Sequence, residues 1–166
     1  MNLIVAVDEK WGIGKKNGLL FDIKADMRYF REKTSGKIVV MGYNTLLSFP
    51  NSKPLKNRVN IVLAPEGVER ADCTVCHTLE QTLKEIKKYP SEDVFIIGGA
   101  MFYNTMYPYC DKAYITHVYN DGAATVFFDD LSKNPDWIVT DRSEVMEEDG
   151  IKFRFCLYEN RSPKPF

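Results

Sequence analysis

The feature that most constrains the fold is a series of short apolar runs separated by segments with helical spacing. The runs are rich in Val and Ile, and they cover residues 2–8, 37–42, 57–64, 73–77 and 93–99. Strands that are apolar on both faces are typical of parallel sheets, because helices cover both sides of such sheets. Helices are predicted for a segment that contains Asp26 and ends near Ser35, and for residues 43–49, 78–89 and 100–109. Thr78 is the expected N-cap of the third helix.

The rest of the chain adds later strands and a glycine-rich loop. Residues 112–119 and 151–159 are predicted strands; the second alternates Ile151, Phe153, Phe155 and Leu157 with polar residues, and residues 136–145 should pair with it antiparallel. Residues 10–18 are expected to form a loop. No repeat or linker is visible, so we expect one α/β domain over residues 1–166, with a mostly parallel sheet and flanking helices.

Charge and hydropathy exclude several classes of partner. The chain has 22 Lys and Arg residues and 23 Asp and Glu residues, a net charge of −1, and no long basic run. Nucleic-acid binding is therefore not expected. The first apolar run is too short for a signal peptide, and no run approaches the length that spans a membrane. We expect a cytoplasmic monomer without a membrane partner.

The cysteines do not predict a metal or haem site. Residues 73–77 match the C-x-x-C-H pattern of covalent haem attachment. Their alternation predicts a short strand instead, and no export signal of the kind that accompanies such attachment is recognised. We interpret Cys73, Cys76, Cys110 and Cys156 as ordinary buried thiols.

Two strand–glycine–helix junctions are candidate ligand sites. Gly98 and Gly99 follow one apolar run and precede a predicted helix, and Gly42 lies at a similar junction. Glycine lets a ligand approach the backbone, and the N–H groups of a helix start attract phosphate. Neither junction is the G-x-G-x-x-G fingerprint. Two such junctions in one parallel sheet nevertheless favour a dinucleotide that lies across the carboxyl ends of the strands.

Asp26 is the main candidate for a chemical role. It lies near the start of an amphipathic helix, between Phe21 on one side and Met27 and Phe30 on the other. An acid in the first turn of a helix complements the helix dipole, which is one explanation. The other explanation is a carboxylate held in an apolar pocket to bind a polar ligand or manage a proton.

Five segments together resemble the dihydrofolate reductase family, in the order and spacing of that family. They are LIVAVDEKWGIGKKNGLL, KADMRYFREKTSGKIVVMGYNT, PLKNRVNIVL, FIIGGAMFY and AYITHV, and the similarity extends from about residue 2 to about residue 158. The resemblance implies a mostly parallel twisted sheet with a final antiparallel strand. It also implies hydride transfer from NADPH to 7,8-dihydrofolate, which produces tetrahydrofolate.

The resemblance identifies Asp26 as the acid that binds the pterin and Thr116 as the residue that holds its carboxylate in place. A pterin presents a ring N–H beside an exocyclic amine, and one carboxylate can accept both donors. Burial should raise the pKa of Asp26. Water is the expected proton donor at N5. The implied substrate residues are Ile4, Val5, Ala6, Asp26, Phe30, Lys53, Arg58, Ile97 and Thr116, with Arg58 binding the glutamate tail and Lys53 assisting at the rim.

The resemblance also implies the residues that bind NADPH. A loop over residues 12–18 is expected to close over the nicotinamide. The implied cofactor residues are Ala6, Gly12, Ile13, Gly14, Asn17, Gly18, Tyr43, Asn44, Thr45, Leu63, Ala64, His77, Gly98, Gly99, Ala100, Met101, Phe102 and Tyr103.

The chain departs from the family pattern at several of these places. Tyr43 and Met101 replace common basic residues, and the Ala64-Pro65 pair replaces a serine that helps to bind the 2′-phosphate. We therefore expect NADPH to be preferred over NADH less strongly than in relatives that carry the arginine. Leu20-Phe21 replaces Pro-Trp, and Ala124 stands where an acid often supports the closing loop.

Two alternatives remain from the sequence. The pyrimidine reductase of riboflavin synthesis shares the Gly-Gly cofactor site, although it is not expected to carry Asp26 followed by Phe30. The chain could also be a non-catalytic relative that binds folate or a nucleotide. Loss of NADPH absorbance on addition of dihydrofolate separates the three.

Overall fold

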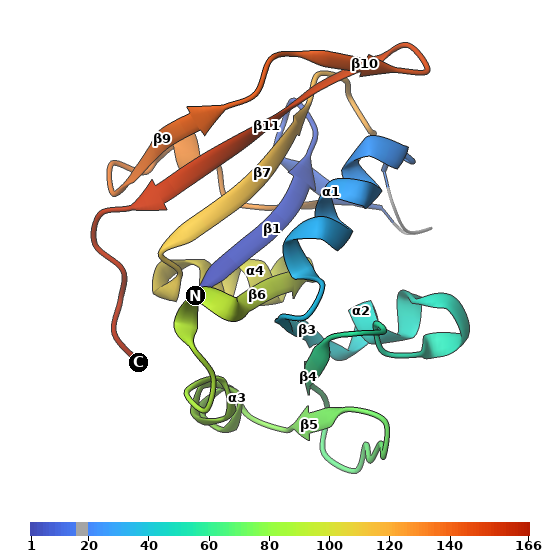
Figure 1. The fold of residues 1–166 in the computed structure, drawn as a ribbon, viewed down its shortest axis with the longest axis vertical. Coiled ribbons are helices and arrows are strands. Elements are labelled where there is room, and N and C mark those ends of the chain that lie inside the picture. The colour runs from blue at the N-terminus through green and yellow to red at the C-terminus, as the bar shows by residue number, and fades with distance from the viewer. Residues whose placement is uncertain (16–19) are drawn as a thin grey trace.

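The computed structural model describes residues 1–15 and 20–166, and within them strands and helices alternate as the apolar runs predict (Figure 1). The strands are β1 (Asn2–Val7), β2 (Gly12–Gly14), β3 (Ile38–Gly42), β4 (Val59–Leu63), β5 (Thr74–Cys76), β6 (Val94–Gly98), β7 (Lys112–Val118), β8 (Val126–Phe127), β9 (Trp137–Arg142), β10 (Met146–Glu148) and β11 (Ile151–Asn160). The α-helices are α1 (Lys24–Thr34), α2 (Tyr43–Ser48), α3 (Leu79–Ile86) and α4 (Ala100–Met106). Short 3₁₀ turns cover Pro50–Ser52, Ser91–Asp93, Tyr107–Tyr109 and Leu131–Lys133. Each of these helices is too short or too polar to span a lipid bilayer.

The main sheet is parallel in its centre and antiparallel at one side, which confirms the predicted fold class. Its strand order is β10-β11-β7-β1-β6-β3-β4-β5, and β9 also pairs with β11. All pairs from β7 to β5 in this order are parallel, whereas β11 runs antiparallel to β7, β9 and β10. The first strand of the chain is therefore the central one. Its carboxyl end lies beside those of β6 and β7.

The two faces of the sheet bury different helices. The cluster around Leu3, Val7 and Ile96 contains residues of α3 and α4, such as Ile86 and Phe102. The cluster around Ile4, Val39 and Ile97 contains Leu46 of α2, and side chains of α1 pack against it. Neighbouring residues of one strand thus face different helices, as expected for a sheet covered on both sides. Thr78 caps α3 as predicted, since its side chain accepts the N–H of Gln81.

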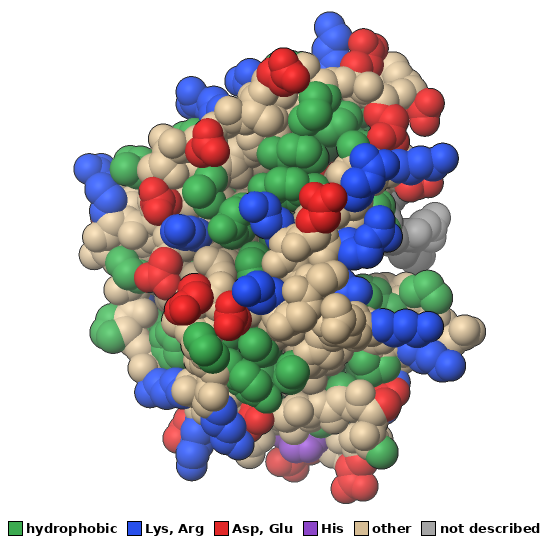
Figure 2. Space-filling view, in the orientation of Figure 1, with side chains coloured by type: hydrophobic (Ala, Val, Ile, Leu, Met, Phe, Trp, Pro, Cys, Tyr) green, Lys and Arg blue, Asp and Glu red, His purple; other side chains and the backbone are tan. Residues whose placement is uncertain are grey.

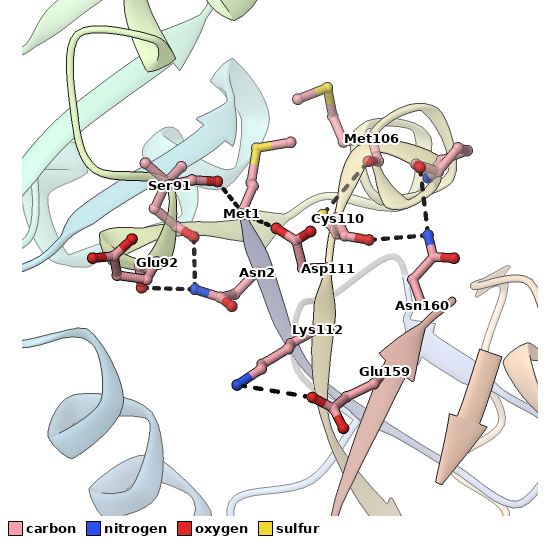
Figure 3. A network of polar contacts seen from close by, with 12 residues as sticks. Met1, Asn2, Ser91, Glu92, Met106, Cys110, Asp111, Lys112, Glu159 and Asn160 are labelled. Atoms are coloured by element: carbon pink, nitrogen blue, oxygen red, sulfur yellow. Dashed lines mark hydrogen bonds and ion pairs between the residues drawn. The ribbon is translucent and has the colours of Figure 1, made fainter. Parts of the chain in front are cut away.

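Polar contacts fix the amino end of β1 between its neighbours (Figure 3). Asn2 donates its side-chain amide to the carbonyls of Glu92 and Val94 at 3.0 and 3.2 Å. On the other side, the side-chain amide of Asn160 in β11 donates to the carbonyl of Cys110 at 3.0 Å, just before β7 begins. These contacts set the start of the central strands, and so the register at their opposite, carboxyl ends.

One sequence expectation needs correction. The expected loop over residues 10–18 contains β2, which pairs with β8, and its residues 16–18 lie outside the described part of the chain. The alternation in β11 is present, because β11 pairs with β7 without interruption and its register shifts only against β9. Phe153 belongs to one core cluster, whereas Cys156 and Tyr158, on the other face of the strand, belong to another. Both faces of β11 are therefore partly covered.

The cysteine interpretation is confirmed. All four cysteines are free; three are buried and Cys73 is half-buried. Cys73 packs with the cluster on one face of the sheet and Cys76 belongs to the cluster on the other face. Two thiols on opposite faces cannot hold one haem, so the C-x-x-C-H match has no functional meaning here.

Candidate active site

Asp26 lies in the first turn of α1, above the carboxyl end of β1. Its Oδ1 accepts the hydroxyl hydrogen of Thr116 at 2.6 Å. Thr116 belongs to β7 and pairs in register with Ala6 of β1. Loss of hydration raises the pKa of the Asp26 carboxyl above its ordinary value, and the bond from Thr116 offsets part of this rise. The predicted contact between Asp26 and Thr116 is therefore present, and the predicted direction of the pKa shift is confirmed.

The start of α1 is stabilised by a residue that the sequence did not reveal. Ile23 is the N-cap of α1 and offers no side-chain acceptor. Glu148 of β10 supplies it instead, because its carboxylate accepts the N–H groups of Lys24 and Ala25 at 2.7 and 3.1 Å. The same N–H groups lower the pKa of Glu148. A carboxylate from the far edge of the sheet thus fixes the helix that carries Asp26.

Apolar side chains from three elements surround this corner of the sheet. Ile4 and Ile97 are buried, and Phe30 packs against the cluster that they share. Val5 and Ala6 are half-buried. Met27 remains half-exposed on α1. The side chains of Ile4, Ile97 and Phe30 therefore lie together on the face that α1 covers, whereas Val5 packs against the cluster on the opposite face.

Arg58 lies beside the last residue of α1, and Lys53 is exposed in the segment that follows α2. The guanidinium of Arg58 donates through Nε to the carbonyl of Lys56 at 2.8 Å and through Nη1 to the hydroxyl of Thr34 at 3.1 Å. Burial and the positive charge of Arg31 lower the pKa of Arg58. Figure 2 shows Lys and Arg side chains gathered along the edge formed by α1 and the segment that follows α2. This edge is suited to an anion.

The two strand–glycine–helix junctions lie side by side. Met41 of β3 pairs with Gly98 of β6, so the strand ends that precede α2 and α4 are neighbours. A Cβ atom on Gly98 would lie 2.8 Å from Oγ1 of Thr45, and its φ of +149° disfavours other residues. The N-caps of α2 and α4 are Gly42 and Gly99, and neither helix start has a side-chain cap. Backbone without side chains therefore lines this edge, as the sequence predicts for a dinucleotide site.

The remaining predicted cofactor residues fall into four groups. Tyr43, Asn44 and Thr45 begin α2. Leu63 ends β4 and Ala64 follows it, beside His77. The Nδ1 atom of His77 lies 3.2 and 3.1 Å from the carbonyl oxygens of Ala64 and Pro65.

The third group, Ala100 to Tyr103, begins α4. Phe102 and Tyr103 are buried, whereas Met101 is 86% exposed. The hydroxyl of Tyr103 donates to the carbonyl of Ile4 at 2.7 Å. Gly12, Ile13 and Gly14 form β2, and Asn17 and Gly18 lie outside the described residues.

The raised pKa of Asp26 has a consequence for stability. Because the folded-state pKa lies above the unfolded value near 3.8, folding favours the neutral carboxyl. The ionised form costs stability increasingly as the pH rises from that unfolded value through the folded pKa. Asp26→Asn should therefore raise the free energy of unfolding at pH 7–8, by about 1.4 kcal/mol for each pKa unit of elevation.

Thermal unfolding at several pH values checks this prediction. The gain in Tm, about 2–4 °C for each kcal/mol in a chain of this size, should shrink as the pH falls towards about 4. Asp22→Asn, which changes an exposed acid just before α1, is the control and should give no such trend. A gain that is constant with pH would contradict desolvation of Asp26 as its cause.

Comparison with known proteins agrees with this geometry. The family model described as "Dihydrofolate reductase" matches residues 1–160. The chain is 32% identical over 166 residues to the dihydrofolate reductase of Bacillus subtilis (strain 168), covering 98% of this chain and 95% of the relative. It is 33% identical over 167 residues to that of Staphylococcus haemolyticus, covering 96% and 95%.

A solved structure agrees as well. Dihydrofolate reductase from Enterococcus faecalis, complexed with NADP(H) and RAB-propyl, matches with a TM-score of 0.83 and 27% identity, covering 96% of this chain and 95% of that chain. The sheet order, the glycine junctions and the contact between Asp26 and Thr116 occur in a chain whose sequence and fold both match this family. The protein therefore belongs to the dihydrofolate reductase family.

Proposed function

We propose that the protein reduces 7,8-dihydrofolate to 5,6,7,8-tetrahydrofolate with NADPH and so supplies reduced folate for one-carbon metabolism. The observation that carries the proposal is the half-buried Asp26 carboxylate, held by Thr116 beside the glycine junctions of β3 and β6. Hydride transfer to a pterin requires a group that binds the pterin and a binding site for the dinucleotide at the same edge of the sheet. Membership of the family supports the same reaction.

Asp26 binds and orients the pterin in this proposal. Its carboxylate accepts the ring N–H and the adjacent exocyclic amine of the substrate, while Thr116 keeps Oδ1 in place. The negative charge stabilises the positive charge that develops on the ring as N5 is protonated by water. Ile4, Val5, Ala6, Phe30 and Ile97 form the apolar surroundings, and Arg58 and Lys53 bind the glutamate tail.

The glycine junctions fit the cofactor. Gly98 and Gly99 leave a cradle at the start of α4 that a Cβ atom would fill, because Thr45 lies directly opposite. When bound there, NADPH supplies the hydride for C6 of the pterin. Residues of α2 and α4 bind its phosphates, and residues of β2 lie on the nicotinamide side. Tyr103 supports this side by bonding to the Ile4 carbonyl.

Discrimination of NADPH from NADH depends on bonds to the 2′-phosphate. Tyr43 offers a hydroxyl without charge, and Pro65 has no N–H to donate. The Nδ1–H of His77 donates to two backbone carbonyls, so Nε2 of the neutral ring is an acceptor and cannot donate to a phosphate oxygen. We infer that the preference for NADPH is weaker than in relatives with an arginine at the position of Tyr43.

Tyr43→Arg should tighten NADPH binding by about 1–2 kcal/mol, the scale of a hydrogen bond to a charged group. NADH should bind nearly as before, since it lacks the 2′-phosphate. Titration of both cofactors against both proteins measures the effect, and Tyr43→Phe is the control that removes the hydroxyl without adding charge. Equal tightening of both cofactors would show that the new arginine binds elsewhere on the dinucleotide.

One assay tests the function itself. NADPH absorbance should fall when dihydrofolate is added to the purified protein. Loss of absorbance with the pyrimidine substrate of riboflavin synthesis, and not with dihydrofolate, would favour the pyrimidine reductase. Binding of folate without turnover would favour a non-catalytic relative. We further propose that the protein acts as a cytoplasmic monomer without a nucleic-acid partner, which size-exclusion chromatography and cell fractionation can test.

A further inference from the structure

Asp8 is a buried carboxylate for which the proposed reaction has no direct use. It follows the last residue of β1 and is 2% exposed. Its Oδ1 accepts the N–H groups of Gly12 and Lys10 at 2.7 and 2.9 Å. Its Oδ2 accepts the N–H of Gly122 at 3.1 Å, from a segment 114 residues farther along the chain. One side chain thus joins two segments that are remote in sequence.

The backbone around Asp8 is built for this contact. A Cβ atom on Gly12 would lie 2.9 Å from both carboxylate oxygens of Asp8 and would collide with the Cβ of Ala124. Trp11 adopts a φ of +62°, in the left-handed region, so that the chain turns back towards Asp8. The Asp8 N–H donates to the Gly12 carbonyl at 2.9 Å and closes the turn. Glycine at position 12 is therefore required by the close approach of the carboxylate and of Ala124.

Backbone hydrogen bonds join the same two segments on either side of Gly122. Glu9 donates its N–H to the Asn120 carbonyl at 3.2 Å, and Thr125 donates to the Gly14 carbonyl at 2.9 Å. β2 pairs with β8 directly after the second of these contacts. On the surface, Lys10 pairs with Asp121 at 3.0 Å. Residues 8–14 and 120–128 thus form one hydrogen-bonded unit, and Asp8 contributes its buried side-chain link.

This unit contacts the candidate active site through aromatic side chains. Trp11 packs against Phe128, with ring centroids 6.0 Å apart, and Phe128 packs against Tyr103 at 5.7 Å. Tyr103 in turn bonds to the carbonyl of Ile4 at 2.7 Å. A shift of residues 120–128 relative to residues 8–14 would therefore be transmitted to α4 and β1, whose residues bind the cofactor and the pterin in the proposed function.

We propose that Asp8 is a positioning residue for the hydride transfer, and this inference rests on the proposed function. Its carboxylate sets the distance between the β1–β2 turn and the loop that precedes β8, and so places Ile13 and Gly14 beside the nicotinamide. Hydride transfer is sensitive to such placement, since a displacement of about 1 Å can cost about a hundredfold in rate. Ala124 stands where an acid was expected from the family pattern. Asp8 is the buried acid that joins these segments, beside the exposed ion pair of Asp121 with Lys10.

Asp8→Asn keeps the hydrogen bonds within the β1–β2 turn and removes the one that comes from Gly122. The amide oxygen can still accept the two N–H groups of Lys10 and Gly12, but the amide nitrogen then faces the N–H of Gly122 and cannot accept it. The change is isosteric, so the fold should persist. Asp121→Asn is the matched control, because it weakens the exposed ion pair between the same segments without touching the buried link.

Single-turnover kinetics and amide exchange test the proposal. In Asp8→Asn we expect the rate of hydride transfer to fall by about tenfold or more, with the Kd values for NADPH and dihydrofolate changed by less than about threefold. Asp121→Asn should stay within about twofold of the unaltered protein. A loss of rate no larger than in this control, or a loss explained by weaker binding alone, would overturn the proposal.

Hydrogen exchange gives a readout that is independent of turnover. In the unaltered protein the amides of Gly12 and Gly122 should exchange as slowly as that of Phe128, which donates to the Trp11 carbonyl. Fast exchange at Gly122 in the unaltered protein would contradict the hydrogen bond to Asp8 and so overturn the proposal, even if no variant folds. If Gly122 is protected but the protein does not oxidise NADPH with dihydrofolate, the proposed function is wrong. The hydrogen bond between Gly122 and Asp8 would then be present without a role in hydride transfer.

Discussion

Asp26→Asn is expected to lower kcat/KM for dihydrofolate by at least about a hundredfold while the protein remains folded. The amide keeps the shape of the carboxylate and can still accept the hydroxyl hydrogen of Thr116. It presents a donor where the pterin needs an acceptor, and it carries no charge to stabilise the protonated ring. Loss of a charged, largely desolvated interaction on this scale corresponds to roughly 3 kcal/mol of transition-state stabilisation.

Steady-state kinetics at saturating NADPH, with dihydrofolate varied from below to above its KM, measures the effect. The decrease should appear in kcat as well as in kcat/KM, because the interaction strengthens as charge develops on the ring. Asp22→Asn, four residues earlier in the chain and exposed, should keep normal turnover. Near-normal turnover in Asp26→Asn would remove Asp26 from the mechanism, and the accompanying gain in stability would then be its sole consequence.

Arg58→Leu should raise KM for dihydrofolate by about 10- to 100-fold with a much smaller decrease in kcat. A charge-assisted hydrogen bond to a carboxylate contributes about 1.5–3 kcal/mol. The glutamate tail is far from the reacting carbon, so its binding is similar in the ground state and the transition state. Burial and the neighbouring Arg31 already disfavour the charge on Arg58, and a substrate carboxylate would relieve this.

Two controls separate tail binding from a structural role of Arg58. A pterin without the glutamate tail should be reduced equally well by Arg58→Leu and by the unaltered protein. Thr34→Val removes the hydroxyl that accepts a bond from Nη1 of Arg58 but keeps the guanidinium, and should change KM much less. If the truncated substrate suffers as much as dihydrofolate, Arg58 acts through the fold and not through the tail.

Much of the fold could be predicted because its signals are local. The runs of Val and Ile, the N-cap Thr78 and the glycines at residues 42 and 98–99 each indicate structure within a few residues. The proximity of Asp26 and Thr116 is not local, since 90 residues separate them. It was predicted only through the resemblance to a family.

The features that were missed depend on partners that no short window contains. Asp8 bonds to Gly122, and Glu148 bonds to Lys24 and Ala25, over 114 to 124 residues. β2 has three residues and β8 has two, which is too short for periodicity to appear. The register shift between β9 and β11 likewise depends on how two strands pair. An acid directly after a buried strand and four residues before a glycine is the one local hint of the Asp8 turn.

The central place of β1 has a consequence for synthesis on the ribosome. Residues 2–7 emerge early, but their partners on either side, β6 and β7, end at residues 98 and 118. At about 5–20 residues per second, both edges of this apolar strand stay unpaired for several seconds or more. A nascent chain with an unpaired apolar strand is a substrate for chaperones and prone to association. We therefore expect ribosome-bound chains that stop before β7 to be protease-sensitive, and resistance to appear only after β7 has left the exit tunnel.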